Sequence, residues 1–276
     1  IDDRLYEHDI DDELRDENSL FERNGFHHSD ALYEVKIVLK NGIYINTNGL
    51  RPRLQNSMRR LAAYSNPEFF KNLKQGFSTK GIPRVVYCGY DNDGNIVLPR
   101  GGGKELLSRL ELAGIEYQIE DRRQTGKSID VSFNGELYPE QLSAASSILA
   151  EENGIVSAAT AFGKTVVGAY LISQRKVNTL IMVHNVEIMN NWVSDLTKFL
   201  SVNEDLPTYT TPSGRLKQRK SLIGTFSSQK NNLTGIIDVV MVSSLGKDSN
   251  VNPMVMDYGM VIMDECHHGA AYTSES

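Results

Sequence analysis

The sequence predicts an α/β fold in which a mostly parallel sheet with flanking helices follows a small α+β accessory domain. Residues 154–158 are a short apolar run, small residues follow, and residues 166–172 are apolar at helical spacing. This pattern is typical of a buried strand, a loop and a helix. A second apolar run, residues 258–263, predicts another buried strand. Closer to the N-terminus, residues 32–39 alternate between apolar and polar, as in a strand with one solvated face. Two different sheets are therefore expected.

We expect three segments along the 276 residues, a length sufficient for one or two domains with their own cores. Residues 1–28 begin with an acidic stretch that lacks hydrophobic periodicity, which indicates an acidic tail or an upstream linker. Residues 29–130 would form the accessory domain, and their last part, residues 120–130, is polar enough to be a linker. Residues 131–276 would form the domain with the parallel sheet.

The elements of the accessory domain follow from turn residues and from apolar periodicity. Asn41-Gly42 predicts a tight hairpin turn. An amphipathic helix is expected around residues 54–62, and the glycines of residues 101–103 lead into a second helix that ends near Gly114. The expected strands are residues 32–39, 43–45, 84–88, 95–98 and 115–119.

The segment from residue 51 to residue 84 is strongly basic. Its one acidic residue is Glu68, and four aromatic residues lie between its basic ones. Basic side chains with interleaved aromatics suit neutralisation of a nucleic-acid backbone and stacking on bases, with Arg59 and Arg60 as candidate contacts. An amphipathic helix with a solvated basic face and an aromatic core explains the pattern equally well. The basic residues are Arg51, Arg53, Arg59, Arg60, Lys71, Lys74, Lys80 and Arg84.

Residues 158–165, AATAFGKT, have the composition of a phosphate-binding loop. The backbone N–H groups of Ala161, Phe162 and Gly163, with the start of the following helix, would point at phosphate oxygens. Lys164 would reach the β- and γ-phosphates, and Thr165 would offer its hydroxyl to Mg²⁺. Alanine takes the place of glycine at the first position of the loop. The alternative is an ordinary strand-to-helix turn of small residues.

The sequence Asp264-Glu265-Cys266-His267 follows the apolar run 258–263. Ligands bind at the carboxyl ends of strands in open α/β sheets, so both carboxylates are expected at that edge, beside Lys164. Asp264 would hold Mg²⁺ through water, and Glu265 would orient or deprotonate an attacking water. His267 would sense the γ-phosphate. A zinc site is disfavoured, because consecutive residues cannot converge on one tetrahedral centre.

These motifs resemble those of superfamily-two helicases, whose DExH form of motif II matches residues 264–267. Residues 137–141, LYPEQ, are similar to the element of the XPB- and UvsW-like branch in which a glutamine, here Gln141, reads adenine. Residues 179–184 with Trp192 resemble motif Ia, and residues 242–245, VSSL, resemble a site of contact with the nucleic-acid backbone. The resemblance implies a RecA-like domain, here without its last part, and nucleic-acid contacts from His184 and Ser243.

A narrower similarity is to helicases that accompany archaeo-eukaryotic primases in TOTE conflict systems. Helicases usually have glycine where this chain has Ala161, and alanine is costly wherever φ must be positive. In the primase-associated helicases alanine is not unusual there.

Trp192, with Ile188 and Leu196 at four-residue spacing, is assigned to the buried face of a helix.

The resemblance implies an ATP-dependent nucleic-acid helicase or translocase that uses ATP and Mg²⁺, with DNA as the expected partner and RNA as the alternative. The chain begins with Ile1 and lacks a Ser/Thr-Ala-Thr element after Glu265, so we expect a fragment that binds ATP weakly and barely hydrolyses it. A second RecA-like domain and a primase or nuclease module are expected partners. The alternative function is a nucleic-acid-binding or scaffold module with a vestigial motor. A GTPase is disfavoured, because no Asn-Lys-x-Asp element is present.

Composition excludes some classes of protein. No apolar run approaches the roughly 20 residues that span a bilayer, so no membrane partner is expected. Two cysteines, Cys88 and Cys266, lie in different predicted domains, which fits a cytoplasmic location. The net charge of −6 argues against a cationic coat over the whole surface, although charge can still be local.

Overall fold

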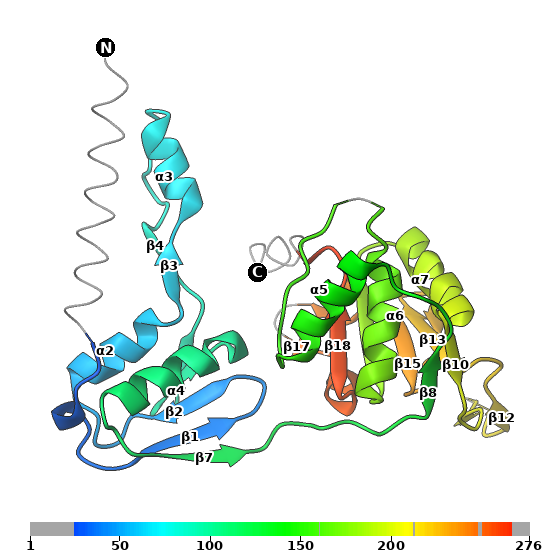
Figure 1. Ribbon diagram of the computed structural model, residues 1–276, viewed down its shortest axis with the longest axis horizontal. Helices are drawn as coiled ribbons and strands as arrows, with labels where there is room; N and C mark the ends of the chain where they lie inside the picture. Colours follow the sequence, from blue (N-terminus) through cyan, green and yellow to red (C-terminus); the bar gives the residue numbers. More distant parts are fainter. Residues whose placement is uncertain (1–24, 160, 212, 248–249, 267–276) are drawn as a thin grey trace. The chain divides into compact units, whose positions relative to one another are not determined.

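The computed structural model describes residues 25–159, 161–211, 213–247 and 250–266 (Figure 1). The chain divides into two compact units, residues 1–123 and 124–276, and each is described by itself. The division falls inside the predicted linker at residues 120–130. The acidic segment 1–24 and His267 lie outside the described residues. Of the helices that the structure describes, none combines the length and apolar character needed to cross a bilayer.

The N-terminal unit is built on a five-stranded mixed sheet. Its strands are β1 (Val35–Leu39), β2 (Ile43–Asn46), β5 (Tyr90–Asn92), β6 (Asn95–Leu98) and β7 (Tyr117–Asp121). They lie in the order β5-β6-β2-β1-β7. The predicted turn at Asn41-Gly42 joins β1 to β2 as an antiparallel hairpin, and β7 pairs with β1 in parallel. The α+β character predicted for this region is confirmed.

Two helices cover the sheet of the N-terminal unit, and both are amphipathic. They are α2 (Pro52–Arg60) and α4 (Gly103–Leu112), and short 3₁₀ turns η1 (His28–Asp30) and η2 (Arg100–Gly102) lie nearby in the chain. Leu54 and Met58 on α2, and Leu106 and Leu110 on α4, are four residues apart and fully buried. This spacing places each pair on one helix face, and the four side chains share one core with the strands.

An arm extends from the N-terminal unit beyond α2 and α4 (Figure 1). It consists of β3 (Ala63–Ser65), α3 (Pro67–Lys74) and β4 (Val85–Tyr87), and β3 pairs with β4 in antiparallel fashion. Asn66 caps α3 by accepting a hydrogen bond from the Glu68 amide, and it donates one to the Pro83 carbonyl. No residue of α3 is buried. The amphipathic helix expected around residues 54–62 is α2, whose buried face is formed by Leu54 and Met58.

The C-terminal unit contains a mostly parallel sheet, as predicted. Its strands are β9 (Thr179–Val183), β13 (Ile223–Ser227), β14 (Lys230–Asn231), β15 (Ile237–Met241) and β18 (Met260–Met263). The order is β14-β13-β15-β9-β18, and β14 pairs antiparallel with β13, whereas the other neighbours are parallel. Leu180, Ile181, Val239 and Val240 are fully buried, as expected for central strands that are covered on both faces.

Helices α6 (Lys164–Arg175) and α7 (Val186–Phe199) cover one face of this sheet, and α5 (Pro139–Leu149) packs beside α6 (Figure 1). The 3₁₀ turns η3 (Val242–Ser244) and η4 (Pro253–Asp257) lie in segments that pack on the other face. Among the described residues, this unit also has three short antiparallel pairs. They are β8 (Val131–Phe133) with β10 (Leu200–Val202), β11 (Thr208–Thr210) with β12 (Leu216–Gln218), and β16 (Gly246–Lys247) with β17 (Asn250–Val251).

The amino edge of this sheet is closed by buried polar side chains. Asp238 is fully buried and accepts hydrogen bonds from the Thr234 amide and hydroxyl, the Gly235 amide and the Tyr258 hydroxyl. Asn178 donates to the carbonyls of Gly235 and Asp257. Buried polar groups are stabilising only when they are paired in this way, so this edge is a structural network.

The strand predicted at residues 154–158 is wrong. These residues have no regular secondary structure, and Ile155 is 82% exposed. Among the described residues, β18 pairs with β9 alone, and Val261 on β18 is 45% exposed. A run made largely of glycine, serine and alanine has little side-chain area to bury. Its two large apolar residues are not sufficient to form a strand against that edge.

Candidate functional site

Three parallel strands of the C-terminal unit end at the same edge of the sheet. β9 ends at Val183 and is followed by His184, β15 ends at Met241 and leads to Ser243, and β18 ends at Met263 and is followed by Asp264. The carboxyl edge of a parallel sheet is where open α/β folds bind ligands. The topology thus brings three of the predicted site residues to one edge.

The loop at residues 161–163 turns directly into α6 at this edge. Gly163 has φ of 83° and precedes the first residue of the helix, Lys164, and Ala161 has φ of 67°. The first helical hydrogen bonds run from the Val166 and Val167 amides to the Gly163 carbonyl. The amides of Lys164 and Thr165 therefore lie in the first turn, where N–H groups and the helix dipole favour an anion.

Lys164 and Glu265 meet across 101 residues of sequence. The Lys164 Nζ lies 3.0 Å from Glu265 Oε1, and the two side chains are 37% and 36% exposed. The hydrogen bond to Glu265 raises the pKa of Lys164 above its usual value. A half-exposed ion pair contributes only about 0–1 kcal/mol to stability. This pair is therefore weak enough to open for a ligand that offers anionic oxygens to the lysine.

Asp264 is held by two contacts with the neighbouring strand and helix. Its backbone amide donates to the Met182 carbonyl of β9 at 3.0 Å. Its Oδ2 accepts a 2.8 Å hydrogen bond from the indole Nε1 of Trp192 on α7. The sequence predicts Trp192 on the buried face of its helix, and this is confirmed. Its hydrogen bond to Asp264 was not predicted. The need of a buried indole N–H for a partner is the signal that could have found it.

Gln141 lies at the start of α5 and is 5% exposed. Its Oε1 accepts from the Tyr138 amide at 3.0 Å, and its Nε2 donates to the Phe162 carbonyl at 2.7 Å. The side chain thus joins the beginning of α5 to the loop before α6. The Phe162 ring packs in a small core with Ala145, which also holds this loop.

The predicted nucleic-acid contacts are placed as follows. The His184 Nε2 lies 3.2 Å from the Glu265 carbonyl, so its ring lies beside the acidic pair. Ser243 is exposed on η3. In the N-terminal unit, Arg60 is exposed, and the Arg59 guanidinium binds both oxygens of Asp91, the nearer at 2.7 Å. That hydrogen bond raises the pKa of Arg59.

Comparison with known families identifies the chain. A family model described as "Type III restriction enzyme, res subunit" matches residues 115–275, more than half of the sequence. The chain belongs to this family. The match covers the phosphate-loop candidate and the acidic pair, so membership extends to both halves of the candidate site.

Relatives of this res-subunit family member include two viral proteins and one solved structure. A protein of Acanthamoeba polyphaga mimivirus, whose name describes an ATP-dependent RNA helicase, is 24% identical over 212 residues, which are 74% of this chain and 34% of that protein. A protein of Invertebrate iridescent virus 6, named as a helicase, is 26% identical over 145 residues, 51% of this chain and 30% of that protein. The chain thus spans about a third of the length of each relative.

The UvsW helicase from bacteriophage T4 has a similar structure. Its crystal structure matches with a TM-score of 0.53 and 14% identity, covering 85% of this chain and 83% of that one. The mixed α/β architecture with its parallel sheet is therefore a RecA-like fold, as predicted.

The side chains at the carboxyl edge of this family member fit a magnesium ion that is bound together with phosphates. Thr165 offers a hydroxyl in the first turn of α6, and Asp264 offers a carboxylate at the end of β18. Among the described residues, no group of three or more His, Cys, Asp or Glu side chains is placed to hold a metal. This sparse set of hard oxygen donors suits Mg²⁺, which keeps several waters and binds one or two carboxylates plus phosphate.

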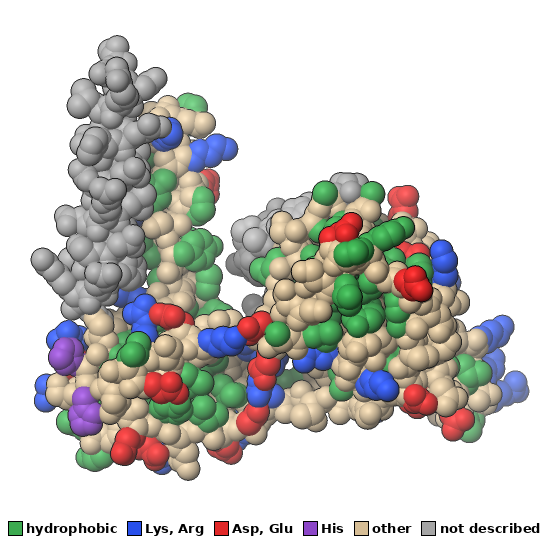
Figure 2. All heavy atoms as spheres, in the orientation of Figure 1, with side chains coloured by type: hydrophobic (Ala, Val, Ile, Leu, Met, Phe, Trp, Pro, Cys, Tyr) green, Lys and Arg blue, Asp and Glu red, His purple; other side chains and the backbone are tan. Residues whose placement is uncertain are grey.

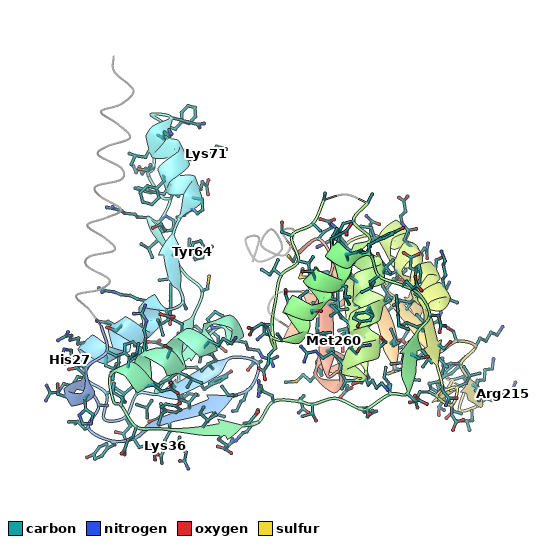
Figure 3. The ribbon with its side chains drawn as sticks, viewed as in Figure 1. His27, Lys36, Tyr64, Lys71, Arg215 and Met260 are labelled. Atoms are coloured by element: carbon teal, nitrogen blue, oxygen red, sulfur yellow. The ribbon has the colours of Figure 1, made fainter. Side chains whose placement is uncertain are left out.

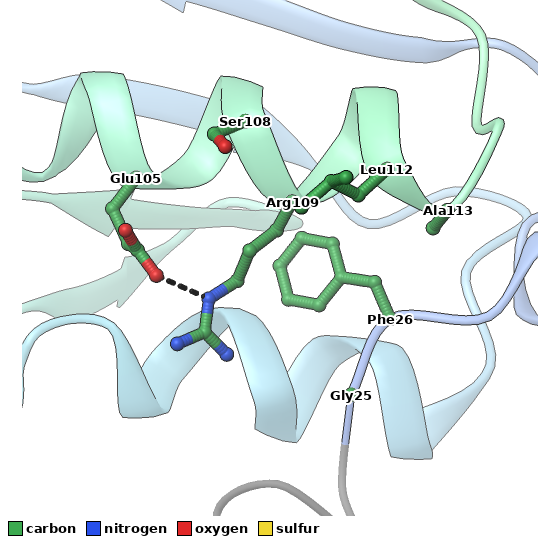
Figure 4. A pocket seen from close by; sticks show the side chains of 7 residues that line it. All are labelled: Gly25, Phe26, Glu105, Ser108, Arg109, Leu112 and Ala113. Carbon is green, nitrogen blue, oxygen red and sulfur yellow. Dashed lines mark hydrogen bonds and ion pairs between the residues drawn. The ribbon is translucent and has the colours of Figure 1, made fainter.

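A pocket in the N-terminal unit lies beside α4. Figure 4 shows the Phe26 ring next to Arg109, whose Nε lies 2.6 Å from Glu105 Oε1. The guanidinium is thus engaged by an acid of the same helix, in an i,i+4 pair that is common on solvated helix faces. The lining residues are Gly25, Phe26, Glu105, Ser108, Arg109, Leu112 and Ala113.

Proposed function

We propose that the C-terminal unit is the nucleotide-binding part of an ATP-dependent nucleic-acid helicase or translocase. One observation carries the proposal: Lys164, at the start of α6, lies 3.0 Å from Glu265, which follows β18 next to Asp264. The cation that would contact phosphate and the acids that would hold a metal and a water are thus within reach of one Mg–nucleotide. Family membership and the helicase names of both viral relatives support the same proposal.

Each residue of the candidate site would have a separate role in phosphoryl transfer to water. The Lys164 ammonium would exchange Glu265 for phosphate oxygens, and the Thr165 hydroxyl and the Asp264 carboxylate would hold Mg²⁺. Bound there, Mg²⁺ would neutralise charge on the β- and γ-phosphates. Glu265, released from Lys164, would accept a proton from, or orient, the attacking water. His267 remains the proposed sensor of the γ-phosphate.

ATP is proposed rather than GTP because of Gln141. Each end of its carboxamide makes one described hydrogen bond, whereas the group can donate two and accept two. One N–H and one lone pair therefore remain, and these are the groups that pair with the edge of adenine. Ala161, Phe162 and Gly163 would supply the backbone that surrounds the phosphates.

Binding of Mg–ATP to the chain tests the proposal, with Lys164→Ala as the main variant. A hydrogen bond to a charged group contributes about 1.5–3 kcal/mol, so the affinity should fall about 10- to 100-fold. Lys217→Ala is the matched control, because Lys217 is an exposed lysine on β12 of the same unit. Equal affinity of wild type and Lys164→Ala would favour a nucleic-acid-binding or scaffold module with a vestigial motor.

The arm of the N-terminal unit is the proposed contact with nucleic acid. Between residues 62 and 88 the chain has four basic residues and one acidic residue. Tyr64 is 51% exposed and Phe77 is 64% exposed, and Lys71 projects from α3 (Figure 3). Hydrophobic and basic side chains cover the same arm in Figure 2. Exposed rings can stack on bases while the lysines neutralise phosphates, so single-stranded DNA is the proposed ligand.

Salt-dependent binding of labelled oligonucleotides to the chain tests the arm. Removing one lysine that touches a phosphate should reduce the slope of log affinity against log salt by about 1, so Lys71→Ala should lower this slope. Lys36→Ala, an exposed lysine on β1, is the matched control. Tyr64→Ala should weaken binding by about 1–3 kcal/mol, because its ring no longer stacks on a base. Preference for RNA would correct the DNA assignment, and equal binding by all variants would refute the arm as the contact.

The same proposal covers the whole protein's partners. A second RecA-like domain would supply an arginine to the bound nucleotide, and a primase or nuclease module would act on the same nucleic acid. His184 and Ser243 would contact its backbone, together with Arg59 and Arg60. Assay of the full-length protein for unwinding and for translocation without unwinding separates the two motor activities.

A further inference from the structure

The indole of Trp192 lies between the helix that follows the phosphate-loop candidate and the acid that follows β18. Trp192 is in the middle of α7 and is 3% exposed. Its Nε1 donates to Asp264 Oδ2 at 2.8 Å. A buried indole N–H needs a partner, and the partner here is the acid at the ligand-binding edge. The hydrogen bond is therefore a contact whose chemical consequence can be tested apart from packing.

Gly168 on α6 makes room for this ring. A Cβ at Gly168 would lie 2.6 Å from Cη2 of Trp192, which is shorter than real Cβ contacts, and 3.0 Å from Cζ3, which is tighter than most of them. The six-membered part of the indole therefore packs against the backbone of α6, one turn after Lys164. This close approach fixes the plane of the ring and hence the direction in which its N–H points.

We propose that Trp192 is a positioning residue for Asp264, and that it orients this carboxylate toward the Mg²⁺ of a bound Mg–nucleotide. The inference rests on the proposed function. One carboxylate oxygen accepts the indole N–H, and this leaves the second oxygen to face the metal or its water. Hydrogen bonds from outer groups orient metal-binding carboxylates in this way, and their loss typically lowers metal affinity about 10- to 100-fold.

Trp192→Phe removes the N–H and keeps an aromatic ring at this position, although the shorter ring no longer reaches Gly168. We expect the affinity of the chain for ADP in the absence of Mg²⁺ to be unchanged, because Lys164 and the loop remain. The Mg²⁺ concentration that gives half-maximal enhancement of binding should rise about 10- to 100-fold. A fluorescent ADP analogue, titrated with MgCl₂, measures both quantities without any turnover.

Phe199→Leu is the matched control. Phe199 is also on α7, and its ring stacks on Phe133 with centroids 6.1 Å apart, away from Asp264. A general loosening of α7 should affect both variants alike. An unchanged Mg²⁺ requirement in Trp192→Phe, or an equal shift in Phe199→Leu, would overturn the inference.

A second measurement uses the wild-type indole itself. Trp192 is the single tryptophan of the chain, so its emission and its indole N–H resonance report on this site alone. Both should change when MgCl₂ is added to the ADP-bound chain, and Asp264→Ala should abolish the change. If the indole signal does not change with Mg²⁺ although Mg²⁺ still strengthens ADP binding, this inference is overturned and the proposed function is not. A wild-type chain that binds no nucleotide overturns the proposed function and this inference with it.

Discussion

The two edges of the parallel sheet in the C-terminal unit both collect acidic side chains, but they treat them differently. At the amino edge, Asp238 is fully buried and accepts four hydrogen bonds. At the carboxyl edge, Asp264 and Glu265 are half-buried. Asp264 accepts from the Trp192 indole, and Glu265 pairs with Lys164. An acid that is fully buried and hydrogen-bonded by its own chain stabilises the fold, whereas a half-buried acid can exchange its contacts for those of a ligand.

Left-handed backbone conformations of residues other than glycine occur at both edges, but in different settings. At the carboxyl edge, Ala161 and Glu265 have φ of 67° and 52°, a region that residues other than glycine rarely adopt. At the amino edge Lys176, the C-cap of α6, has φ of 51°, and the other positive φ values there belong to Gly126 and Gly235, for which they cost little. Strained residues other than glycine cluster at functional sites. Lys176 ends a helix, where a left-handed residue is common, whereas Ala161 and Glu265 both belong to the candidate site.

The largest expected difference between the edges is in stability. Asp238→Ala would leave the amides of Thr234 and Gly235 and the hydroxyl of Tyr258 without their acceptor in a buried site. We expect the free energy of unfolding to fall by about 3–5 kcal/mol, measured by urea denaturation. Asp264→Ala should lower it by about 1 kcal/mol or less, yet should abolish the effect of Mg²⁺ on nucleotide binding. Equal destabilisation by the two substitutions would remove the distinction between the edges.

Gln141 combines both kinds of role, and Gln141→Ala should affect both stability and binding. Loss of its hydrogen bonds to Tyr138 and Phe162 should lower the free energy of unfolding by about 1–3 kcal/mol. The affinity for ATP should fall more than that for GTP, because the edge of adenine loses its partner. Urea denaturation and competition between the two nucleotides measure these effects. A preserved preference for ATP would show that the residue only supports the loop.

The pH dependence of stability tests the amino edge through Tyr258. Burial, followed by the nearby Asp238 charge, raises the pKa of the Tyr258 hydroxyl. The folded chain thus keeps this proton at a pH where the unfolded chain, with a tyrosine pKa of about 10, has lost it. The associated stability is complete below about pH 10 and is lost above it, at about 1.4 kcal/mol per pH unit. Tyr258→Phe should lack this component, and identical slopes for the two proteins would contradict it.

Much of the fold could be predicted from the sequence because hydrophobic periodicity and turn residues act locally. The hairpin at Asn41-Gly42, the strand before Asp264 and the helix after Gly163 depend on such signals. The strand at residues 154–158 was wrong because strand formation depends on a neighbour, which periodicity does not reveal. The arm was open to two interpretations because its basic and aromatic residues fit either an exposed or a packed helix.

The candidate site could be predicted where a residue's chemistry is itself unusual, as for Lys164 and the adjacent Asp264 and Glu265. Their approach follows from two motifs that meet at one sheet edge. The contact of Trp192 with Asp264, and the amino-edge network around Asp238, could not be predicted. Both depend on pairings across 72 and 20 residues of sequence, which only the packed structure specifies.

The smallest expected effect is a gain in stability, where the preceding substitutions are expected to cause losses. Ala161→Gly should relieve the left-handed conformation of this residue, which costs an L-residue roughly 1–2 kcal/mol. Glycine also has more freedom to lose on folding, by about 0.5–1 kcal/mol, so the net gain in the free energy of unfolding should be about 0.5–1 kcal/mol. The affinity for Mg–ATP should stay within about twofold, because the backbone N–H groups keep their directions. Gly163→Ala is the matched change, since a Cβ there would lie 2.6 Å from Gln141 Nε2 at φ of 83°. Gly163→Ala should lower both the free energy of unfolding and the affinity for Mg–ATP. If Ala161→Gly lowers the free energy of unfolding instead, the alanine methyl contributes more to packing than its strained φ costs.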